Sequence, residues 1–284
     1  MTVRVGTRGS ALALAQTALV TAALEGLGLR TEVVTIRTQG DRNPHHPTLA
    51  LGIGAFVKDL ESALLDGHID LAVHSAKDMP GAVSEGLALA AFLPREDPRD
   101  ALIARGNTGL RELAPGAIIG TDSPRRRAFL LAARPDLVVQ GIRGNVDTRL
   151  HKLGAGDVDA LVLAMAGLTR LDLQYHVTEP LDVSLMLPAV GQGAVAVQVR
   201  GDDERMRERL ALVDHAPTRV AVVAERAFLA ALGGGCQRPI AALGTSEDDR
   251  LILEGAVLDA GGTRVIRDAI EGPASQAADL GEQL

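Results

Sequence analysis

Tryptophan is absent from the 284-residue chain, and aromatic residues make up only 2% of it. Proteins that bind single-stranded nucleic acid stack the bases on aromatic side chains, so this composition disfavours that class. No apolar run is long enough to span a bilayer, and residues 1–8 lack the apolar stretch of a signal peptide. We expect a cytoplasmic monomer with no nucleic-acid or membrane partner.

Lysine is also scarce, although the chain carries 29 basic residues. Only Lys58, Lys77 and Lys152 are lysines, so the other 26 are arginines. The net charge is nevertheless −7, which argues against a general binder of nucleic acid or membrane surfaces. Coding bias is one explanation of the arginine excess, and bidentate recognition of carboxylates is the other.

The chain has a single cysteine, Cys236, which follows Gly233, Gly234 and Gly235. A lone cysteine forms no internal disulfide and cannot build a thiolate metal cage by itself. Glycines remove side-chain bulk and allow turns that other residues do not adopt, which suits a thiol presented to a large group. The alternative is a small buried residue in a glycine-rich turn.

Short β-branched runs alternate with Ala/Leu-rich helical stretches through most of the chain, a pattern typical of parallel sheets flanked by helices. The predicted strands cover residues 3–5, 31–38, 69–73, 117–120, 137–140, 160–164, 194–199, 251–258 and 263–270. The predicted helices cover residues 11–24, 56–65, 124–133, 145–153 and 218–232. The fold class is therefore α/β, with a small α+β unit at the C-terminal end.

Two segments read as crossovers between domains, the charged segment 95–100 and the Pro/Gly-containing segment 187–193. The strand at 194–199 then returns to the first sheet. Two α/β units joined in this way enclose a cleft, a common place for small-molecule sites. We expect three domains: residues 1–94 with 194–212, residues 99–188, and residues 216–284.

Three strand-to-helix turns carry arginines. In residues 120–127, GTDSPRRR, Ser123 is a good N-cap, and arginines fill the first helical turn, where they oppose the helix dipole unless an anion is present. The other two turns are residues 7–10 and 143–149. Each alone could be a solvated turn, but three in one acidic protein favour a polycarboxylate or phosphorylated ligand.

A polar segment, His74 to Pro80, follows the predicted buried strand at 69–73. Asp78 in an arginine-lined cleft is a candidate acid/base or a stabiliser of positive charge, whereas Lys77 and Asp78 could also be an ordinary surface pair. For His74 we favour a hydrogen-bonded core residue. The chain has no GxxxxGK[ST] phosphate loop and no convincing metal-ligand spacing, so we expect no metal.

Taken together, eight motifs in order resemble the porphobilinogen deaminase (hydroxymethylbilane synthase) family. They are GTRGSALALAQ, FVKDLE, AVHSAKDMP, REDPRDAL, GTDSPRRR, IRGNVDTRL, LPAVGQGA, and AERAFL with GGGCQ. The resemblance covers nearly the whole chain. It implies two α/β domains like those of periplasmic binding proteins and a small C-terminal α+β domain that carries the cysteine.

The resemblance also implies an activity, the stepwise deamination of four porphobilinogen molecules and their head-to-tail addition to a dipyrromethane primer. Hydrolysis then releases the linear tetrapyrrole hydroxymethylbilane. By matching position, Cys236 holds the primer through a thioether and Asp78 is the catalytic aspartate. The runner-up is a non-enzymatic bilobal protein that binds a small carboxylate.

Further residues match the family's binding positions. Those implied to contact the cofactor, with Cys236 and Asp78, are Lys77, Thr121, Ser123, Arg125, Arg126 and Arg143. Those implied to contact substrate are Arg8, Ser10, Phe56, Arg149, Arg170 and Gln192. There are departures: the stretch 49–55 lacks the family's usual lysines, Arg238 replaces a small apolar residue, and the family's C-terminal helix extends beyond the position of Leu284.

Overall fold

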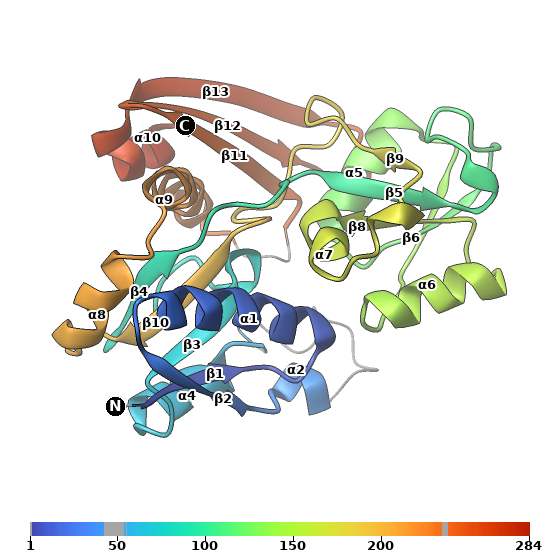
Figure 1. Ribbon diagram of the computed structural model, residues 1–284. Coiled ribbons are helices and arrows are strands. Elements are labelled where there is room, and N and C mark those ends of the chain that lie inside the picture. Colours follow the sequence, from blue (N-terminus) through green and yellow to red (C-terminus); the bar gives the residue numbers. More distant parts are fainter. Residues whose placement is uncertain (1, 43–53, 55, 235–237) are drawn as a thin grey trace.

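The computed structural model describes residues 2–42, 54, 56–234 and 238–284. These residues form three sheets with their helices (Figure 1). Two sheets have five strands each and lie side by side, and a three-stranded sheet lies above them in this view. The predicted fold class, two α/β units and a small α+β unit, is confirmed.

The first sheet has the strand order β2-β1-β3-β10-β4. Its strands are β1 (Thr2–Thr7), β2 (Arg30–Thr35), β3 (Leu71–Ser75), β4 (Leu87–Phe92) and β10 (Val195–Arg200). Strand β1 is parallel to β2 and β3, whereas β10 is antiparallel to β3 and β4. The helices of this unit are α1 (Ala11–Gly26), α2 (Gln39–Arg42), α4 (Lys58–Leu65) and α8 (Glu204–Ala211), with a 3-10 turn at Ala76–Asp78.

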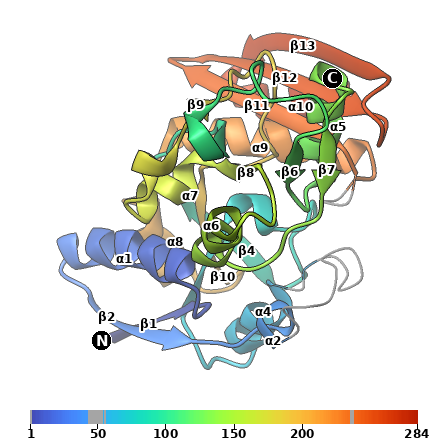
Figure 2. The ribbon, with the colours of Figure 1, turned by 90° about the vertical axis from the view of Figure 1, so that its right-hand side faces the viewer.

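The second sheet repeats this pattern in the order β7-β6-β8-β5-β9. Its strands are β5 (Asp100–Ala104), β6 (Ile118–Gly120), β7 (Val138–Gln140), β8 (Ala160–Ala164) and β9 (Glu179–Pro180). Its helices are α5 (Pro124–Ala133), α6 (Val146–Ala155) and α7 (Met165–Arg170). Figures 1 and 2 show α6 on the side of this unit that faces α1.

The chain passes from the first sheet to the second and back again. In each sheet, three parallel strands are followed by one strand that runs antiparallel to its neighbours, β10 in the first and β5 in the second. Strand β5 enters the second sheet directly after the first crossover, and β10 returns to the first sheet after the second crossover. The predicted return of residues 194–199 to the first sheet is therefore confirmed, and both crossovers pass between the units.

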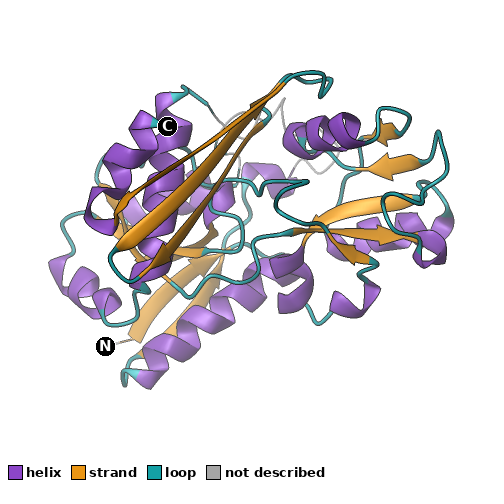
Figure 3. Cartoon of the chain, turned by 90° about the horizontal axis from the view of Figure 1, so that it is seen from above, coloured by secondary structure: helices purple, strands orange, loops and turns teal. Residues whose placement is uncertain are grey.

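The third sheet is antiparallel and contains β11 (Ile240–Glu247), β12 (Arg250–Leu258) and β13 (Val265–Pro273). Helices α9 (Ala216–Ala231) and α10 (Ala277–Gln283) pack on it. Seen from above, its long strands cross the molecule diagonally (Figure 3). Ala241, Ala256 and Leu258 of this sheet share an apolar core with Ala128 and Phe129 of α5, so the third unit is packed directly against the second.

Most predicted elements are present, with shifted ends. The helix predicted at 124–133 and the strand at 160–164 have the predicted bounds. The strand predicted at 31–38 ends at Thr35, and the helix predicted from Phe56 begins at Lys58. Strands β4, β5, β9 and β11 and helices α2, α7, α8 and α10 were not predicted from the sequence. No helix among the described residues is long and apolar enough to cross a membrane.

One buried carboxylate joins the third unit to both crossovers. Glu225 of α9 is fully buried and accepts hydrogen bonds from Arg95 Nη1 at 2.5 Å in the first crossover and from the Gly191 amide at 2.6 Å in the second. It also accepts from the Gly244 amide of β11 at 2.8 Å. Because these donors lie on three separate segments, Glu225 fixes their relative positions.

Replacing Glu225 by alanine removes this shared acceptor and leaves Arg95, whose side chain is 11% exposed, without its counter-charge. Loss of one partner of a buried ion pair costs on the order of 3–5 kcal/mol, so we expect a large fall in the thermal unfolding midpoint. The control is Glu271→Ala, which removes an exposed pair with Arg250, worth less than about 1 kcal/mol. Equal small losses in both variants would contradict the assigned role of Glu225.

Candidate active site

A cavity of about 270 Å³ lies between the two five-stranded units. The first unit contributes the turn after β1, helix α1 and the end of β3, and the second contributes the start of α5, the start of α6 and α7. The second crossover closes one side through Gly191, Gly193 and Ala194. The predicted cleft between the α/β units is therefore present, and polar side chains from both units face it.

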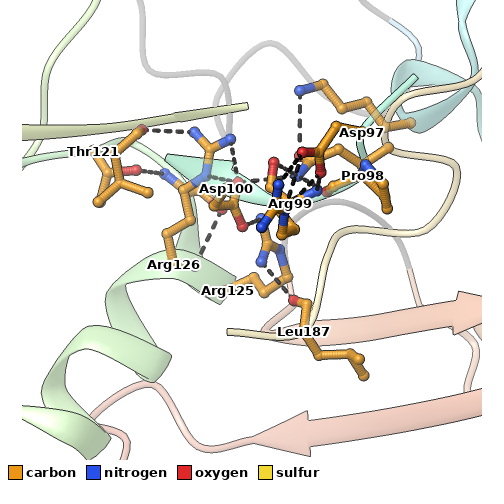
Figure 4. A network of polar contacts seen from close by, with 12 residues as sticks. Asp97, Pro98, Arg99, Asp100, Thr121, Arg125, Arg126 and Leu187 are labelled. Atoms are coloured by element: carbon orange, nitrogen blue, oxygen red, sulfur yellow. Dashed lines mark hydrogen bonds and ion pairs between the residues drawn. The ribbon is translucent and has the colours of Figure 1, made fainter. Parts of the chain in front are cut away.

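The arginines that begin α5 are buried, which rules out the solvated alternative for two of the three. Arg125 and Arg126 are only 4% and 7% exposed, and both pair with the fully buried Asp100 (Figure 4). Arg125 Nη2 lies 2.7 Å from Asp100 Oδ2, and Arg126 Nη2 lies 2.8 Å from Asp100 Oδ1. The third, Arg127, is exposed and donates to the Val139 carbonyl.

The local sequence of α5 positions this pair. The Ser123 hydroxyl accepts from the Arg126 amide at 3.3 Å, and Pro124 occupies the first helical turn, as predicted for an N-cap followed by proline. The two cations near the helix N-terminus would be unfavourable alone, and the Asp100 carboxylate offsets them. The Arg125 Nε is buried and has no hydrogen-bond partner among the described residues.

Gln192 connects the second crossover to the same cluster. Its Nε2 donates to Asp100 Oδ1 at 3.0 Å and to the Pro98 carbonyl at 2.7 Å. Its Oε1 lies 3.5 Å from Lys77 Nζ. Gln192 is 1% exposed, so here it acts as a buried bridge between the two crossovers.

Arg149 and Arg170 border the cavity from α6 and α7. Their hydrogen bonds go to main-chain carbonyls, from Arg149 Nε to Gly144 at 2.9 Å and from Arg170 Nη2 to Gly193 at 2.7 Å. Burial lowers the pKa of Arg149 to about 10, helped by the nearby Arg126 charge, and burial also lowers the pKa of Arg170. A carboxylate ligand would relieve both guanidinium groups of this penalty.

Asp78 and Lys77 lie on the 3-10 turn that follows β3, and both border the cavity. Burial and, less strongly, the neighbouring Arg126 lower the pKa of Lys77 to about 8, while Asp78 and Asp100 oppose the shift. Asp78 is half-buried in a cavity whose charged lining is mostly cationic, with Asp147 as its other carboxylate. A carboxylate in that position can stabilise a cation that forms beside it.

Arg8 is held by Asp41 and Phe56. Its Nη2 lies 2.5 Å from Asp41 Oδ1, and its Cζ lies 4.1 Å from the centre of the Phe56 ring. Ser10 caps α1 by accepting from the Ala13 amide at 3.3 Å. Arg8, Ser10 and Phe56 all border the cavity.

The cavity brings together the predicted residues Arg8, Ser10, Phe56, Lys77, Asp78, Arg126, Arg149 and Arg170. Thr121, Ser123, Arg125, Arg143 and Gln192 lie near it but do not border it, and Arg143 pairs with Asp122 through its Nε at 2.7 Å. Cys236 and residues 49–53 and 55 of the lysine-free stretch lie outside the described residues.

Sequence reasoning missed Gln16, Ser75, Asp41 and Asp100. Gln16 and Ser75 hydrogen-bond to each other at the cavity wall, with Gln16 Nε2 2.9 Å from Ser75 Oγ. Both lie in the motifs given above, and the available signal was a polar side chain inside an apolar helix for Gln16 and at a strand end for Ser75. Within the described part of the chain, no group of three or more His, Cys, Asp or Glu side chains could hold a metal.

Two sequence-family models match the chain almost end to end. Residues 3–208 match "Porphobilinogen deaminase, dipyromethane cofactor binding domain", and residues 220–284 match "Porphobilinogen deaminase, C-terminal domain". The chain belongs to the porphobilinogen deaminase family. This confirms the resemblance, and it favours an enzyme of that family over the bilobal binding protein.

Curated porphobilinogen deaminases are similar over the same length. The protein of Desulforudis audaxviator is 51% identical over 99% of this chain and 92% of its own. That of Thermus thermophilus is 48% identical over 99% of this chain and 93% of its own. Among solved structures, a periplasmic substrate-binding protein of Coxiella burnetii is 18% identical and covers 79% of this chain and 96% of its own, with a TM-score of 0.46. With the family established and the two sheets equivalent in strand order, the expected fold of the porphobilinogen deaminase family is confirmed.

Behind Asp78, a buried polar chain crosses the first unit of this porphobilinogen deaminase family member. His74 Nε2 lies 2.9 Å from Gln198 Oε1, and Gln198 Nε2 donates to Glu61 Oε1 at 2.8 Å. Ser84 Oγ donates to the other Glu61 oxygen at 2.8 Å. His74 is therefore a hydrogen-bonded core residue, as expected.

Burial lowers the pKa of His74 from 6.5 to about 4, so folding favours its neutral form. The stabilisation is fully present above pH 6.5 and is lost as the pH falls from 6.5 to 4, on the order of 3 kcal/mol in all. We expect His74→Gln to show a smaller fall in thermal midpoint between pH 7 and pH 4.5 than the unsubstituted protein. Parallel curves for both proteins would contradict a neutral, buried His74.

Proposed function

We propose that this chain joins four porphobilinogen molecules head to tail on a dipyrromethane primer held by Cys236, and releases hydroxymethylbilane by hydrolysis. The carrying observation is a cavity between two α/β units in which Asp78 lies among Arg8, Arg126, Arg149 and Arg170. Each porphobilinogen carries an acetate and a propionate, so the growing product is a polyanion. An arginine-lined cavity in an acidic protein suits that ligand.

The residues present fit a dipyrromethane group. Its four carboxylates need buried cationic donors, and Arg125 and Arg126 are such donors, more than nine-tenths buried. The buried Arg125 Nε, which has no acceptor among the described residues, is consistent with a further acceptor at this position. We propose that Lys77, Thr121, Ser123 and Arg143 complete the cofactor site, with Cys236 as the attachment point. The bound primer supplies a pyrrole with a free, nucleophilic α-carbon.

For the substrate we propose Arg8, Ser10, Phe56, Arg149, Arg170 and Gln192. Arg149 and Arg170 donate to main-chain carbonyls and have no carboxylate ion pair among the described residues, so their charge is available to a substrate carboxylate. Gln192 would act through Asp100 and Lys77, because it is buried and does not border the cavity. Binding both carboxylates would orient the aminomethyl group toward Asp78.

In each addition, the C–N bond of the aminomethyl group breaks and ammonia leaves. A C–C bond then forms between that methylene carbon and the α-carbon of the preceding pyrrole, which loses its proton. Positive charge develops on the pyrrole nitrogens during both steps. We propose that the Asp78 carboxylate stabilises this charge and helps to move the proton.

The three predicted units would divide this work. Residues 1–94 with 194–212 would carry Asp78, residues 99–188 the buried arginines, and residues 216–284 the cysteine. The three sheets and the two crossovers support this division. We further propose that the protein works as a monomer in the cytoplasm, the state expected from the sequence.

Asp78→Asn should reduce the turnover of porphobilinogen by about 10²–10⁴-fold, because the amide cannot stabilise positive charge or accept a proton as a carboxylate does. The thermal midpoint should change little, since Asp78 is half-buried. Product formation is followed in a stopped assay after oxidation to porphyrin. Asp66→Asn, at the exposed end of α4, is the control. Full activity in Asp78→Asn would contradict the assigned role.

The intact mass of the purified protein tests the cofactor. We expect an added mass equal to two linked pyrroles, and its absence in Cys236→Ser. If the unsubstituted protein lacks the adduct, it should gain the adduct on incubation with porphobilinogen. A protein that neither carries nor gains the adduct is not this enzyme.

A further inference from the structure

Arg8, which follows β1, borders the cavity, and two residues from a different part of the chain fix its side chain. They are Asp41 in α2 and Phe56 just before α4. Asp41 accepts two hydrogen bonds from the same guanidinium, from Nη2 at 2.5 Å and from Nε at 3.2 Å. The Phe56 ring covers one face of that group at 4.1 Å. The guanidinium is thus constrained along one edge and over one face.

Asp41 is itself fixed in place. The Thr38 hydroxyl donates to Asp41 Oδ2 at 2.7 Å, and the Thr38 amide donates to the same oxygen at 3.2 Å. Burial alone would raise the pKa of Asp41, but the hydrogen bonds from Arg8 and Thr38 lower it. Asp41 therefore stays ionised at neutral pH. The carboxylate is a rigid, charged support for Arg8.

Phe56 is positioned by a glycine in the same segment. A Cβ atom at Gly40 would lie 2.0 Å from the Phe56 ring, so only glycine allows the ring to lie against α2. In the segment Thr38-Gln39-Gly40-Asp41, Thr38 hydrogen-bonds to Asp41, Gly40 leaves room for the Phe56 ring, and Asp41 supplies the carboxylate. All three features serve the same guanidinium.

The edge of the Arg8 guanidinium that Asp41 does not contact, which we call its outer edge, is available to a ligand. Its Nε and Nη2 are used by Asp41, and no described residue accepts a hydrogen bond from its Nη1. Arg126, by contrast, uses Nε on Asp100 and Nη1 on the Val162 carbonyl. Both arginines border the cavity, but only Arg8 combines a fixed inner edge with an uncommitted outer one.

We propose that Asp41 is a positioning residue that, with Phe56, holds the outer edge of Arg8 toward the cavity to bind one carboxylate of the incoming pyrrole. This inference rests on the proposed function. Asp41 does not border the cavity and acts only through Arg8. The bidentate form of the pair explains why a carboxylate is required there, since an amide supplies only one acceptor for the two N–H groups.

The test is Asp41→Asn, assayed for porphobilinogen consumption across substrate concentrations. A loosened Arg8 should raise KM about tenfold, the effect of losing roughly one hydrogen bond to a charged group, with kcat changed less than about twofold. In an Arg8→Lys background, Asp41→Asn should add less than about a twofold change. Thr38→Val keeps the Asp41 charge and the amide bond to it but removes the hydroxyl bond, and should raise KM by a smaller factor.

The matched control is Asp70→Asn. Asp70, just before β3, pairs with Arg4 of β1 through the same guanidinium atoms, Nε at 3.1 Å and Nη2 at 2.7 Å, but neither residue borders the cavity. We expect this variant to lose thermal stability and to keep its KM. The comparison separates the loss of an arginine–aspartate pair from the loss of a positioned Arg8.

Two results would overturn the inference. A lower KM in Asp41→Asn would mean that Asp41 competes with the substrate carboxylate for Arg8, and an unchanged KM with a lower thermal midpoint would mean a purely structural pair. Neither result contradicts the proposed function, which fails if the unsubstituted protein does not consume porphobilinogen or neither carries nor gains the adduct.

Discussion

The buried Asp100 carboxylate is the constraint on which the site depends. It begins the strand that enters the second sheet, and it faces two buried guanidinium groups and the Gln192 amide. Taking three ionised side chains out of water costs several kcal/mol for each ion, and their mutual attraction offsets this cost only with good geometry. The first turn of α5, the first crossover and the second crossover therefore have to meet at one point. The cavity lies where they meet.

Glu225 imposes a similar condition on the third unit. Its carboxylate accepts donors from both crossovers and from β11, and the third sheet also shares an apolar core with α5. The first crossover contains Asp100 and binds Glu225 through Arg95, and the second binds both carboxylates through the neighbouring residues Gly191 and Gln192. A short glycine-containing segment separates the end of α9 from Cys236, so the unit that carries the cysteine is tied to the same two crossovers that border the cavity.

The arginines of this chain differ in function because they differ in partners. Arg125 and Arg126 are buried and neutralised in part by Asp100, Arg143 is held by Asp122, and Arg8 by Asp41. Arg149 and Arg170 meet only main-chain carbonyls among the described residues. The cavity consequently keeps a positive charge inside a protein whose net charge is −7. Such a field favours a polyanion without making the whole surface a binder of anions.

The sequence by itself determined the elements whose signals are local. Ser123 and Pro124 start α5 where predicted, and the apolar run of β8 has both predicted ends, because caps and apolar runs depend on neighbouring residues. Strand β4, LALAAF, carries no alternation and was missed. Motif order along the chain also sufficed to indicate the family. Only the tertiary structure decided which arginines are buried and what each one contacts. Asp100 contacts Arg126 and Gln192, which lie 26 and 92 residues further along the chain. Asp41 contacts Arg8, which lies 33 residues before it. Desolvation and ion pairing depend on such distant partners, which no local pattern contains.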